Sequence, residues 1–274
     1  MNKKLKNIAL TGLILTAGLS LAACGKSTSA SHTKTYTIGV ASDAEKAEWT
    51  QVAKDVKKDN INLKVKEFTD YTLENPSLED GSLDLNAFQH TAFLNNWNQE
   101  NHGDLVGIGY TYISPFGLYS KKITNYNQLK DGDKVAIPND PTNEGRSLQL
   151  LDAIHVITLK KNAPSSPSLK DIATYNKKIK IELLEGDQIV AALPDVTAAT
   201  INTNFVQDQL HTTPEKAALY IDTDHQAHVN SIYKNIVVVK KDKKDNADFQ
   251  KLVKAYQTEA VAKIIEKGGD KPAW

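Results

Sequence analysis

Apolar residues recur along most of the chain with two spacings, the period of two that is typical of strands and the period of 3.6 that is typical of helices. Residues 36–40 alternate apolar and polar side chains, which is the period-two pattern of a half-buried strand. Ser42 and Glu45 then stand at the spacing of a capping box, ahead of Trp49 and Val52 at helical spacing. These two segments predict a β-α unit at the start of the folded body.

Strands and helices alternate along the rest of the chain in the same way. Helices are predicted where Leu148, Leu151 and Ile154 share one face, and where an apolar face over residues 249–256 follows a cap at Asp245. This alternation predicts an α/β protein with helices flanking its sheets. The ~240 residues of the body exceed the usual ~100 to 200 of one domain, so they fit one large or two smaller units. Further strands are expected at residues 63–68, 83–87, 105–112, 117–120, 134–137, 179–184, 197–201 and 236–239.

The N-terminus has the pattern of an export signal. Residues 1–6 carry three lysines, residues 8–21 form an apolar run, and residues 21–24 read Leu-Ala-Ala-Cys. The run is shorter than the ~20 apolar residues of a membrane-spanning helix, so residues 1–23 are predicted to be a cleaved secretory signal. The tetrapeptide resembles the bacterial lipobox, in which the cysteine receives a lipid. The alternative is an uncleaved anchor helix ahead of an incidental Cys24.

Composition narrows the class of protein. Residues 24–34 are rich in Ser, Thr, Lys and Ala without apolar periodicity, which predicts a flexible tether. Cys24 is the only cysteine, so the body has neither a disulfide framework nor a thiolate metal site. The chain has 33 lysines plus arginines and 33 aspartates plus glutamates. It therefore lacks the excess of positive charge that is typical of a nucleic-acid-binding protein.

Motifs of common enzymes and cofactor sites are missing from the sequence. There is no G-x-S-x-G elbow, no P-loop and no H-E-x-x-H motif, and no nucleophile stands beside a matched base. We therefore expect neither catalysis nor a cofactor. Asp222, Asp224, His225 and His228 are competent metal ligands, although such clusters are more often solvated loops. A metal-binding lipoprotein that uses this cluster or His90 stays an alternative, as does an adhesive surface lipoprotein.

The segment over residues 138–146 predicts an anion site. Asp140 is a favourable N-cap and Pro141 stands at the first helical position, so a helix should begin here with free backbone N–H groups. Such groups attract anions, and the planar guanidinium of Arg146 can bind a carboxylate through two hydrogen bonds. A ligand carboxylate would fit here. The alternative is an ion pair between Arg146 and a protein carboxylate such as Glu144.

Aromatic and amide side chains gather near the predicted strand ends. Residues 68–71 and 86–93 bring together several rings and one imidazole, which suit an apolar or thioether side chain. Taken singly, each ring could equally belong to the core. Asn202 and Asn235 flank strand ends, where ligands of open α/β sheets bind. Each amide oxygen could accept a hydrogen bond from a ligand ammonium, or each residue could be the ordinary asparagine of a turn.

Several short motifs occur in a distinctive order along the chain. They are Phe-Thr-Asp-Tyr at 68–71, Asn-Ala-Phe-Gln-His at 86–90, Tyr-Ser-Lys-Lys-Ile at 119–123, Pro-Asn-Asp-Pro-Thr-Asn at 138–143 with Gly-Arg-Ser at 145–147, Ile-Asn-Thr-Asn at 201–204, and Trp274. On these motifs, residues 35–274 resemble the NlpA-type lipoproteins, whose best-known members are methionine-binding lipoproteins of ABC importers.

The resemblance implies a type II periplasmic binding-protein fold with two α/β lobes, a hinge and a cleft between the lobes. Lobe I would comprise residues 35–119 and 233–274, and lobe II residues 120–232. The chain would cross between the lobes near Tyr119 and again within residues 220–235.

The resemblance also implies a function and a set of contacts. The protein would be exported, anchored to the cell membrane by lipid on Cys24, and monomeric. It would capture an amino acid, methionine above all, and present it to the permease of an ABC importer. In the implied pocket Arg146 and Asn143 hold the ligand carboxylate, Asn202 and Asn235 hold the amino-acid backbone, and the side chain is walled by Tyr71, Phe88, His90 and Phe93.

Three features depart from the family pattern and leave the ligand open. Phe93 and Ser114 stand where family members often have tyrosine, and residues 188–195 lack an expected proline-arginine pair. Loss of a hydroxyl removes a hydrogen bond on which specificity can depend. Another amino acid or a short methionine-containing peptide is therefore the alternative ligand.

Overall fold

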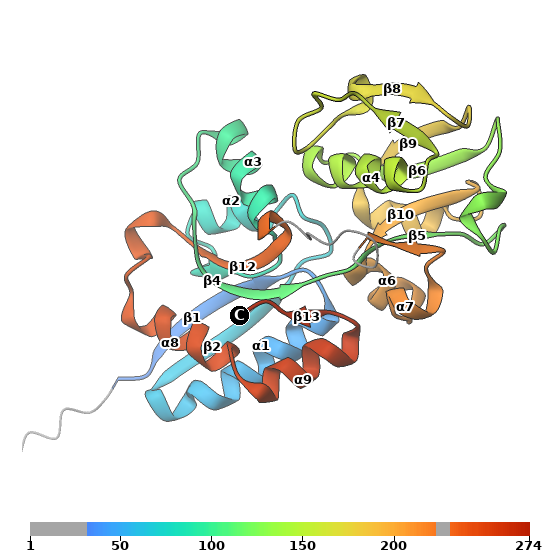
Figure 1. The fold of residues 1–274 in the computed structure, drawn as a ribbon. Coiled ribbons are helices and arrows are strands. Elements are labelled where there is room, and N and C mark those ends of the chain that lie inside the picture. Colours follow the sequence, from blue (N-terminus) through green and yellow to red (C-terminus); the bar gives the residue numbers. More distant parts are fainter. Residues whose placement is uncertain (1–31, 223–230) are drawn as a thin grey trace, which may run out of the picture. The chain divides into compact units, whose positions relative to one another are not determined.

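The computed structural model describes residues 32–222 and 231–274. Within it Thr33–Trp274 form one compact unit that contains two separate mixed sheets, each flanked by helices (Figure 1). This confirms the prediction of an α/β protein with two lobes. No helix of the described part is long and apolar enough to span a membrane.

Some of the sequence predictions lie outside the described residues. These are the signal segment, the tether up to residue 31, and three members of the possible metal cluster. Cys24, Asp224, His225 and His228 are the candidate site residues concerned.

Lobe I is built on a six-stranded sheet. Its strands are β1 (Lys34–Val40), β2 (Ile61–Glu67), β3 (Leu85–Asn86), β4 (Val106–Ile113), β12 (Lys234–Val239) and β13 (Lys271–Pro272), in the order β13-β4-β12-β3-β1-β2. Its helices are α1 (Asp43–Asp55), α2 (Glu74–Glu79), α3 (Thr91–Asn101), α8 (Ala247–Tyr256) and α9 (Glu259–Gly268). Along β12, Val237 and Val239 pack with α1, α8 and α9, while Ile236 and Val238 pack with α2 and α3. Both faces of this sheet are therefore covered.

Lobe II is built on a five-stranded sheet. Its strands are β5 (Phe116–Tyr119), β6 (Lys134–Pro138), β9 (Lys180–Leu184), β10 (Ala198–Asn202) and β11 (Tyr220–Ile221), in the order β11-β5-β10-β6-β9. Its helices are α4 (Pro141–Ala153), α5 (Ile189–Ala192), α6 (Thr203–Leu210) and α7 (Pro214–Ala217). Along β10, Ala198 packs with α4, whereas Ala199 and Ile201 pack with α5 and α6. This sheet is also buried on both faces.

Smaller elements complete the two lobes. An antiparallel hairpin of β7 (Ile157–Leu159) and β8 (Ile172–Tyr175) follows α4. Short 3-10 helices occur at η1 (Val56–Asp59), η2 (Tyr126–Gln128), η3 (Leu169–Asp171), η4 (Gly186–Gln188), η6 (Ser231–Tyr233) and η7 (Lys241–Lys243).

The chain passes from lobe I to lobe II between β4 and β5. β4 ends at Ile113, and β5 pairs antiparallel with β10 and β11 of the second sheet. Pro115 lies between the two strands, and proline ends strand pairing because it has no backbone N–H. The first crossing is therefore at Ser114 and Pro115, a few residues before the expected position near Tyr119. The return crossing follows Ile221 and includes residues 223–230, which lie outside the description.

Candidate functional site

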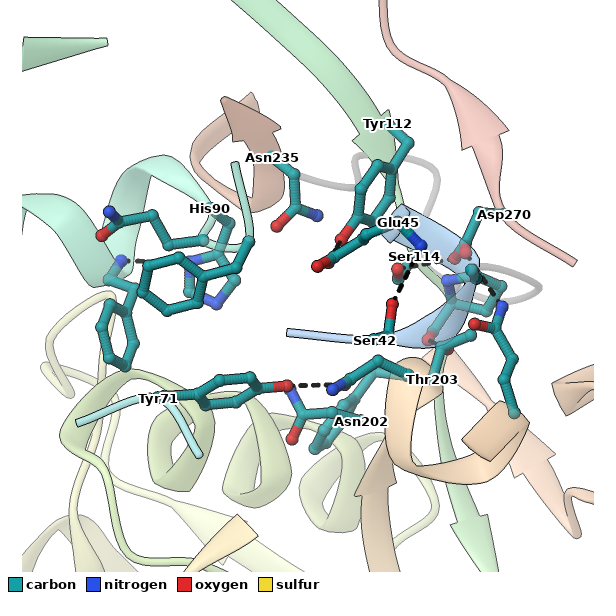
Figure 2. Close-up of a pocket in the computed structure, with 18 of the residues that line it drawn as sticks. Ser42, Glu45, Tyr71, His90, Tyr112, Ser114, Asn202, Thr203, Asn235 and Asp270 are labelled. Carbon is teal, nitrogen blue, oxygen red and sulfur yellow. Dashed lines mark hydrogen bonds between the residues drawn. The ribbon is translucent and has the colours of Figure 1, made fainter. Parts of the chain in front are cut away.

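One cavity, with about 580 Å³ of empty space, is lined by both lobes (Figure 2). The structure brings together at this cavity all the residues that sequence reasoning assigned to ligand binding. They are Tyr71, Phe88, His90, Phe93, Asn143, Arg146, Asn202 and Asn235.

The start of α4 forms the lobe II wall. Asp140 caps the helix, and its carboxylate accepts from the backbone N–H of Asn143 at 3.0 Å and from the side-chain Nδ2 at 2.9 Å. The Asn143 side chain is thereby oriented with its Oδ1 toward the cavity residues Asn202 and His90. Asn202 Nδ2 donates to this oxygen at 3.1 Å, and His90 Nε2 lies 3.4 Å from it. The predicted helix start thus positions the amide of Asn143 between two other candidate ligand contacts.

Arg146 is buried and held in a fixed orientation. Its Nε donates to Asp222 Oδ2 at 2.7 Å, and its Nη2 donates to the carbonyl of Ser114 at 2.8 Å. The guanidinium carbon also lies 4.9 Å from the ring centre of Phe116 and 4.7 Å from that of Tyr233. Among the described residues no partner is found for Nη1, so this nitrogen of the guanidinium is available to donate to a ligand.

The acidic partner of Arg146 is not the one considered from sequence. Glu144 accepts instead from the backbone N–H of Leu169 at 2.9 Å, so the ion pair that was the alternative for Arg146 is present but with another carboxylate. Asp222 takes that place, and its second oxygen accepts from the backbone N–H of Phe116 at 2.9 Å. Both oxygens of Asp222 thus accept hydrogen bonds from groups of the site. The described residues contain no group of three or more side chains suited to a metal.

Three aromatic rings form an apolar end of the cavity. The ring centres of Tyr71, Phe88 and Phe93 lie 5.7 to 6.0 Å apart, in tilted and edge-to-face arrangements that favour ring pairs. The Tyr71 hydroxyl donates to Asn204 Oδ1 of lobe II at 2.6 Å. This end of the cavity is therefore closed by a hydrogen bond between the lobes.

His90 is neutral and has a defined tautomer. Its Nδ1 accepts from the backbone N–H of Phe93 at 3.0 Å as it caps α3, so the remaining proton resides on Nε2. Burial and the charge of Arg146 lower the pKa of His90 to about 3. At neutral pH this side chain carries no charge, and its Nε2 proton faces Asn143 Oδ1 at 3.4 Å.

Two amide side chains in the cavity have hydrogen-bonding capacity that the described residues do not use. Asn235 is only 6% exposed and its side chain makes no hydrogen bond to them, while the buried Oδ1 of Asn202 is also unsatisfied. Figure 2 shows Asn235 above the cavity and Asn202 below it. Buried polar groups are nearly always hydrogen-bonded, so these two amides indicate where a polar ligand group would lie.

Sequence reasoning missed an acidic end of the same cavity. Burial raises the pKa of Glu45 to about 8 and that of Asp270 to about 7. In the sequence Glu45 belongs to a predicted helix cap, and Asp270 lies near the C-terminus outside any motif. The residues that form this end are Ser42, Glu45, Glu48, Tyr112, Ser114, Gln207 and Asp270.

Comparisons with known proteins agree with the fold and the cavity. The profile of a family described as NlpA lipoprotein matches residues 36–274. The D-methionine-binding lipoprotein MetQ of Salmonella typhi is 37% identical, over 99% of each chain. The substrate-binding protein of a methionine transporter from Streptococcus pneumoniae superposes with a TM-score of 0.81 at 38% identity, covering 89% of this chain and 97% of that one. A nutrient-binding protein from Burkholderia cenocepacia bound to methionine gives a TM-score of 0.81 at 37% identity, covering 87% and 100%.

Proposed function

The chain belongs to the NlpA lipoprotein family, and from that premise we propose that it captures methionine between its lobes for delivery to an ABC importer. One observation carries the proposal. A single cavity is lined by an oriented arginine, by the amides of Asn202 and Asn235, and by a cluster of aromatic rings. These groups suit the carboxylate, the ammonium and the side chain of a free apolar amino acid. Relatives with this fold are named as methionine-binding proteins.

The ligand carboxylate would bind at the start of α4. The free Nη1 edge of Arg146 can donate to it, and charge-assisted bonds of this kind are roughly twice as strong as neutral ones. Asp222 neutralises part of the arginine charge and also holds the guanidinium in place. The Arg146 side chain therefore loses little conformational entropy when the ligand binds. The second contact would be the remaining N–H of Asn143 Nδ2, whose other N–H donates to Asp140 Oδ2.

The ligand side chain would lie among Tyr71, Phe88 and Phe93. A thioether is flexible and polarisable, and each sulfur contact with a ring contributes about 0.3 to 1.5 kcal/mol. The neutral His90 borders this region and donates a hydrogen bond without adding charge. An apolar side chain is thus favoured over a charged one.

Binding would be coupled to closure of the two lobes. The Tyr71 hydroxyl and Asn204 join the lobes beside the aromatic end, and Gln207 Nε2 donates across to the Gly268 carbonyl at 2.7 Å. A ligand held by both lobes favours the closed state by its extra contacts there. Relatives are binding proteins, and the proposed cycle of capture and release includes no chemical step.

Export and membrane attachment follow from the N-terminal sequence. Cleavage before Cys24 would leave its thiol to carry the lipid, and residues 24–34 would act as the tether. One lipid-bearing residue on a flexible tether would keep the lobes free to reach the permease.

The proposal is tested by calorimetry with L- and D-methionine on the wild type, Asn235→Ala and the matched control Asn95→Ala. The Asn235 side chain has no partner among the described residues, so its removal should not destabilise the free protein. We expect at least a tenfold weaker Kd for Asn235→Ala, because a buried bond to a charged group is worth about 1.5 to 3 kcal/mol. Asn95 lies on the exposed side of α3 and should leave Kd unchanged. Absence of binding by both enantiomers to the wild type would refute the proposal.

A further inference from the structure

The motif at residues 86–90 contains two amide residues to which the proposed function gives no ligand contact. Phe88 and His90 of this motif line the cavity as proposed contacts. The other two, Asn86 and Gln89, are 0% and 2% exposed. Burial of an amide is costly unless its polar atoms are hydrogen-bonded, so the position of these two beside the site calls for a physical reason.

A third buried amide completes the group. Asn75 of α2 is 0% exposed, and its Nδ2 donates to Gln89 Oε1 at 2.9 Å. The Oδ1 of Asn75 accepts from Asn86 Nδ2 at 2.9 Å and from Gln89 Nε2 at 2.5 Å. Gln89 Nε2 also donates to Asn86 Oδ1 at 2.9 Å. Each of the three side chains is thus hydrogen-bonded to the other two, and together they form an amide triangle.

The amide triangle fixes the orientation of its members. Asn75 and Gln89 exchange two hydrogen bonds, so a half-turn of either amide would set N–H against N–H and oxygen against oxygen. Asn86 donates to one of them and accepts from the other, which holds its own amide in the same way. Hydrogen bonds in a buried site act at low effective dielectric and are stronger there than in water. The triangle therefore resists rotation of any one of its side chains.

The amide triangle links two segments that carry the lobe I wall of the cavity. Asn75 lies four residues after Tyr71 in the chain. Gln89 lies between Phe88 and His90. Figure 2 shows Tyr71 and His90 on the same side of the cavity. The bonds between Asn75 and Gln89 therefore tie the segment of Tyr71 to the segment of Phe88 and His90.

The amide triangle is also connected to the strand that carries Asn235. The backbone carbonyl of Gln89 accepts from the N–H of Ile236 at 3.0 Å, and His90 pairs with Asn235 in an isolated antiparallel bridge. A displacement of Gln89 would therefore move the backbone at Asn235 as well as its own neighbour His90. The triangle thus reaches proposed ligand contacts on separate segments of lobe I.

Apolar side chains could fill the space of the amide triangle at a lower cost. Leu78 lies about one turn after Asn75 on α2, and Val238 pairs with Asn86 in the sheet; both belong to an apolar cluster. Amides buried beside such a cluster lose hydration that apolar side chains do not have. Apolar contacts are non-directional, however, whereas a buried hydrogen-bond network specifies one arrangement. The amides are therefore suited to positioning and not merely to filling the core.

We propose that Asn75, Asn86 and Gln89 are positioning residues of the ligand site. They act through Phe88 and His90, whose places at the cavity they fix before a ligand arrives. This inference rests on the proposed function of the same cavity, because the positions of these two side chains affect binding only if they contact the ligand. A preorganised wall loses less conformational entropy on binding than a mobile one, so the triangle increases affinity.

Calorimetry of the full chain with L-methionine tests this role in Asn75→Leu, which keeps a similar size and removes the side-chain hydrogen bonds. We expect Kd to rise about fivefold or more, the equivalent of one hydrogen bond. A loss of stability alone does not cause this rise, because the apparent Kd scales only with the folded fraction, which unfolding curves measure. The matched control is Asn98→Leu, since Asn98 exchanges hydrogen bonds of 2.8 and 3.1 Å with the Leu105 backbone outside the cavity. Its Kd should match the wild type, and an equal rise in both variants overturns the proposal.

NMR of the ligand-free protein gives a second readout. In the wild type His90 Nδ1 accepts from the Phe93 N–H and the proton resides on Nε2, so the two ring nitrogens should give well-separated ¹⁵N signals. In Asn75→Leu we expect these signals to approach each other, because a ring that is no longer held in place exchanges between tautomers. Wild-type ring signals together with a wild-type Kd overturn the proposal.

A further variant covers the case in which Asn75→Leu does not fold. Asn75→Ala leaves space in which water can replace the lost hydrogen bonds, so the same changes in Kd and in the His90 signals are expected at smaller size. Unchanged values of both in the folded Asn75→Ala variant overturn the proposal. Failure of the wild type to bind methionine defeats the proposed function instead, and the ring signals then still decide whether the triangle positions His90.

Discussion

Arg146 is a buried charged residue that has a structural partner and a proposed role in ligand binding. Asp222, 76 residues further along the chain, fixes its Nε, and the Ser114 carbonyl fixes Nη2. The guanidinium is therefore oriented before any ligand arrives. Such preorganisation increases affinity because fewer rotamers are lost on binding.

The two roles of Arg146 can be separated by a pair of variants. Arg146→Ala leaves Asp222 buried and unpaired, which should lower the free energy of unfolding by about 3 to 5 kcal/mol. The double variant Arg146→Ala with Asp222→Asn removes that charge and should recover much of the loss. Denaturant unfolding measures stability, and calorimetry should find no methionine binding in either variant. Binding at wild-type affinity by the double variant would show that Arg146 is only structural.

Glu45 makes stability depend on pH in the unusual direction for a carboxyl. Its pKa rises from an ordinary 4.5 to about 8 on burial, so the folded state holds a proton that the unfolded state has lost. Its contribution is complete below pH 4.5 and is lost as pH rises through about 8.

Glu45→Gln should remove this dependence because glutamine has a similar shape and does not ionise. At pH 5 the free variant should match the wild type, and at pH 8 it should be more stable by up to about 4 kcal/mol. Thermal unfolding of the ligand-free protein at both pH values provides the measurement. A larger difference at pH 5 than at pH 8 would contradict the assignment.

Among the elements, helix starts were predicted better than strand limits. The cap of α4 at Asp140 with Pro141 in the first turn is local chemistry, and the structure confirms it. The cap of α8 is Asn246, so the predicted cap at Asp245 is wrong by one residue. The predicted strand over residues 83–87 contributes only Leu85–Asn86, and the hairpin of β7 and β8 was not predicted. Strand limits depend on pairing partners that are distant in the chain, whereas a helix cap satisfies its own neighbouring N–H groups.

The cap of α4 should matter for binding as well as for stability. Asp140→Ala removes the bonds that orient Asn143, so both the melting temperature and the methionine affinity should fall, with about 1 kcal/mol lost in stability. Asn246→Ala removes an equivalent cap from α8, away from the cavity, where Asn246 accepts from Asp248 N–H at 2.9 Å. It should cost similar stability and leave affinity unchanged. Equal affinity losses in both variants would argue against a positioning role for Asp140.

At the level of the whole molecule, direct hydrogen bonds join the two lobes beside the cavity. Tyr71 with Asn204 is the shortest of those at the aromatic end, at 2.6 Å. Tyr71→Phe keeps the ring and removes this bond, which is worth about 0.5 to 1.5 kcal/mol. We expect methionine to dissociate roughly 2- to 10-fold faster in stopped-flow fluorescence, with association nearly unchanged. The control Tyr175→Phe, on the exposed hairpin, should match the wild type, and a slower association in Tyr71→Phe would point away from closure.

Membrane attachment is also a property of the whole molecule. If the Cys24 thiol carries the lipid, Cys24→Ser should abolish incorporation of labelled palmitate and move the protein from the membrane fraction to the soluble one. Methionine affinity should not change, because the lipid lies beyond the tether. Labelled membrane-bound protein in the Cys24→Ser variant would exclude this anchor.

The sequence alone determined the parts that depend on neighbouring residues: the α/β alternation, the start of α4, and the motifs that carry Tyr71, His90 and Arg146 to one site. It did not reveal that Asp222 pairs with Arg146. It also did not reveal that Glu45 of α1 and Asp270 near the C-terminus meet at one end of the cavity. Those contacts exist because sheet order and the packing of two lobes bring distant segments together. Burial then changes the chemistry, because it raises the pKa of a carboxyl group above the value that the group has in water.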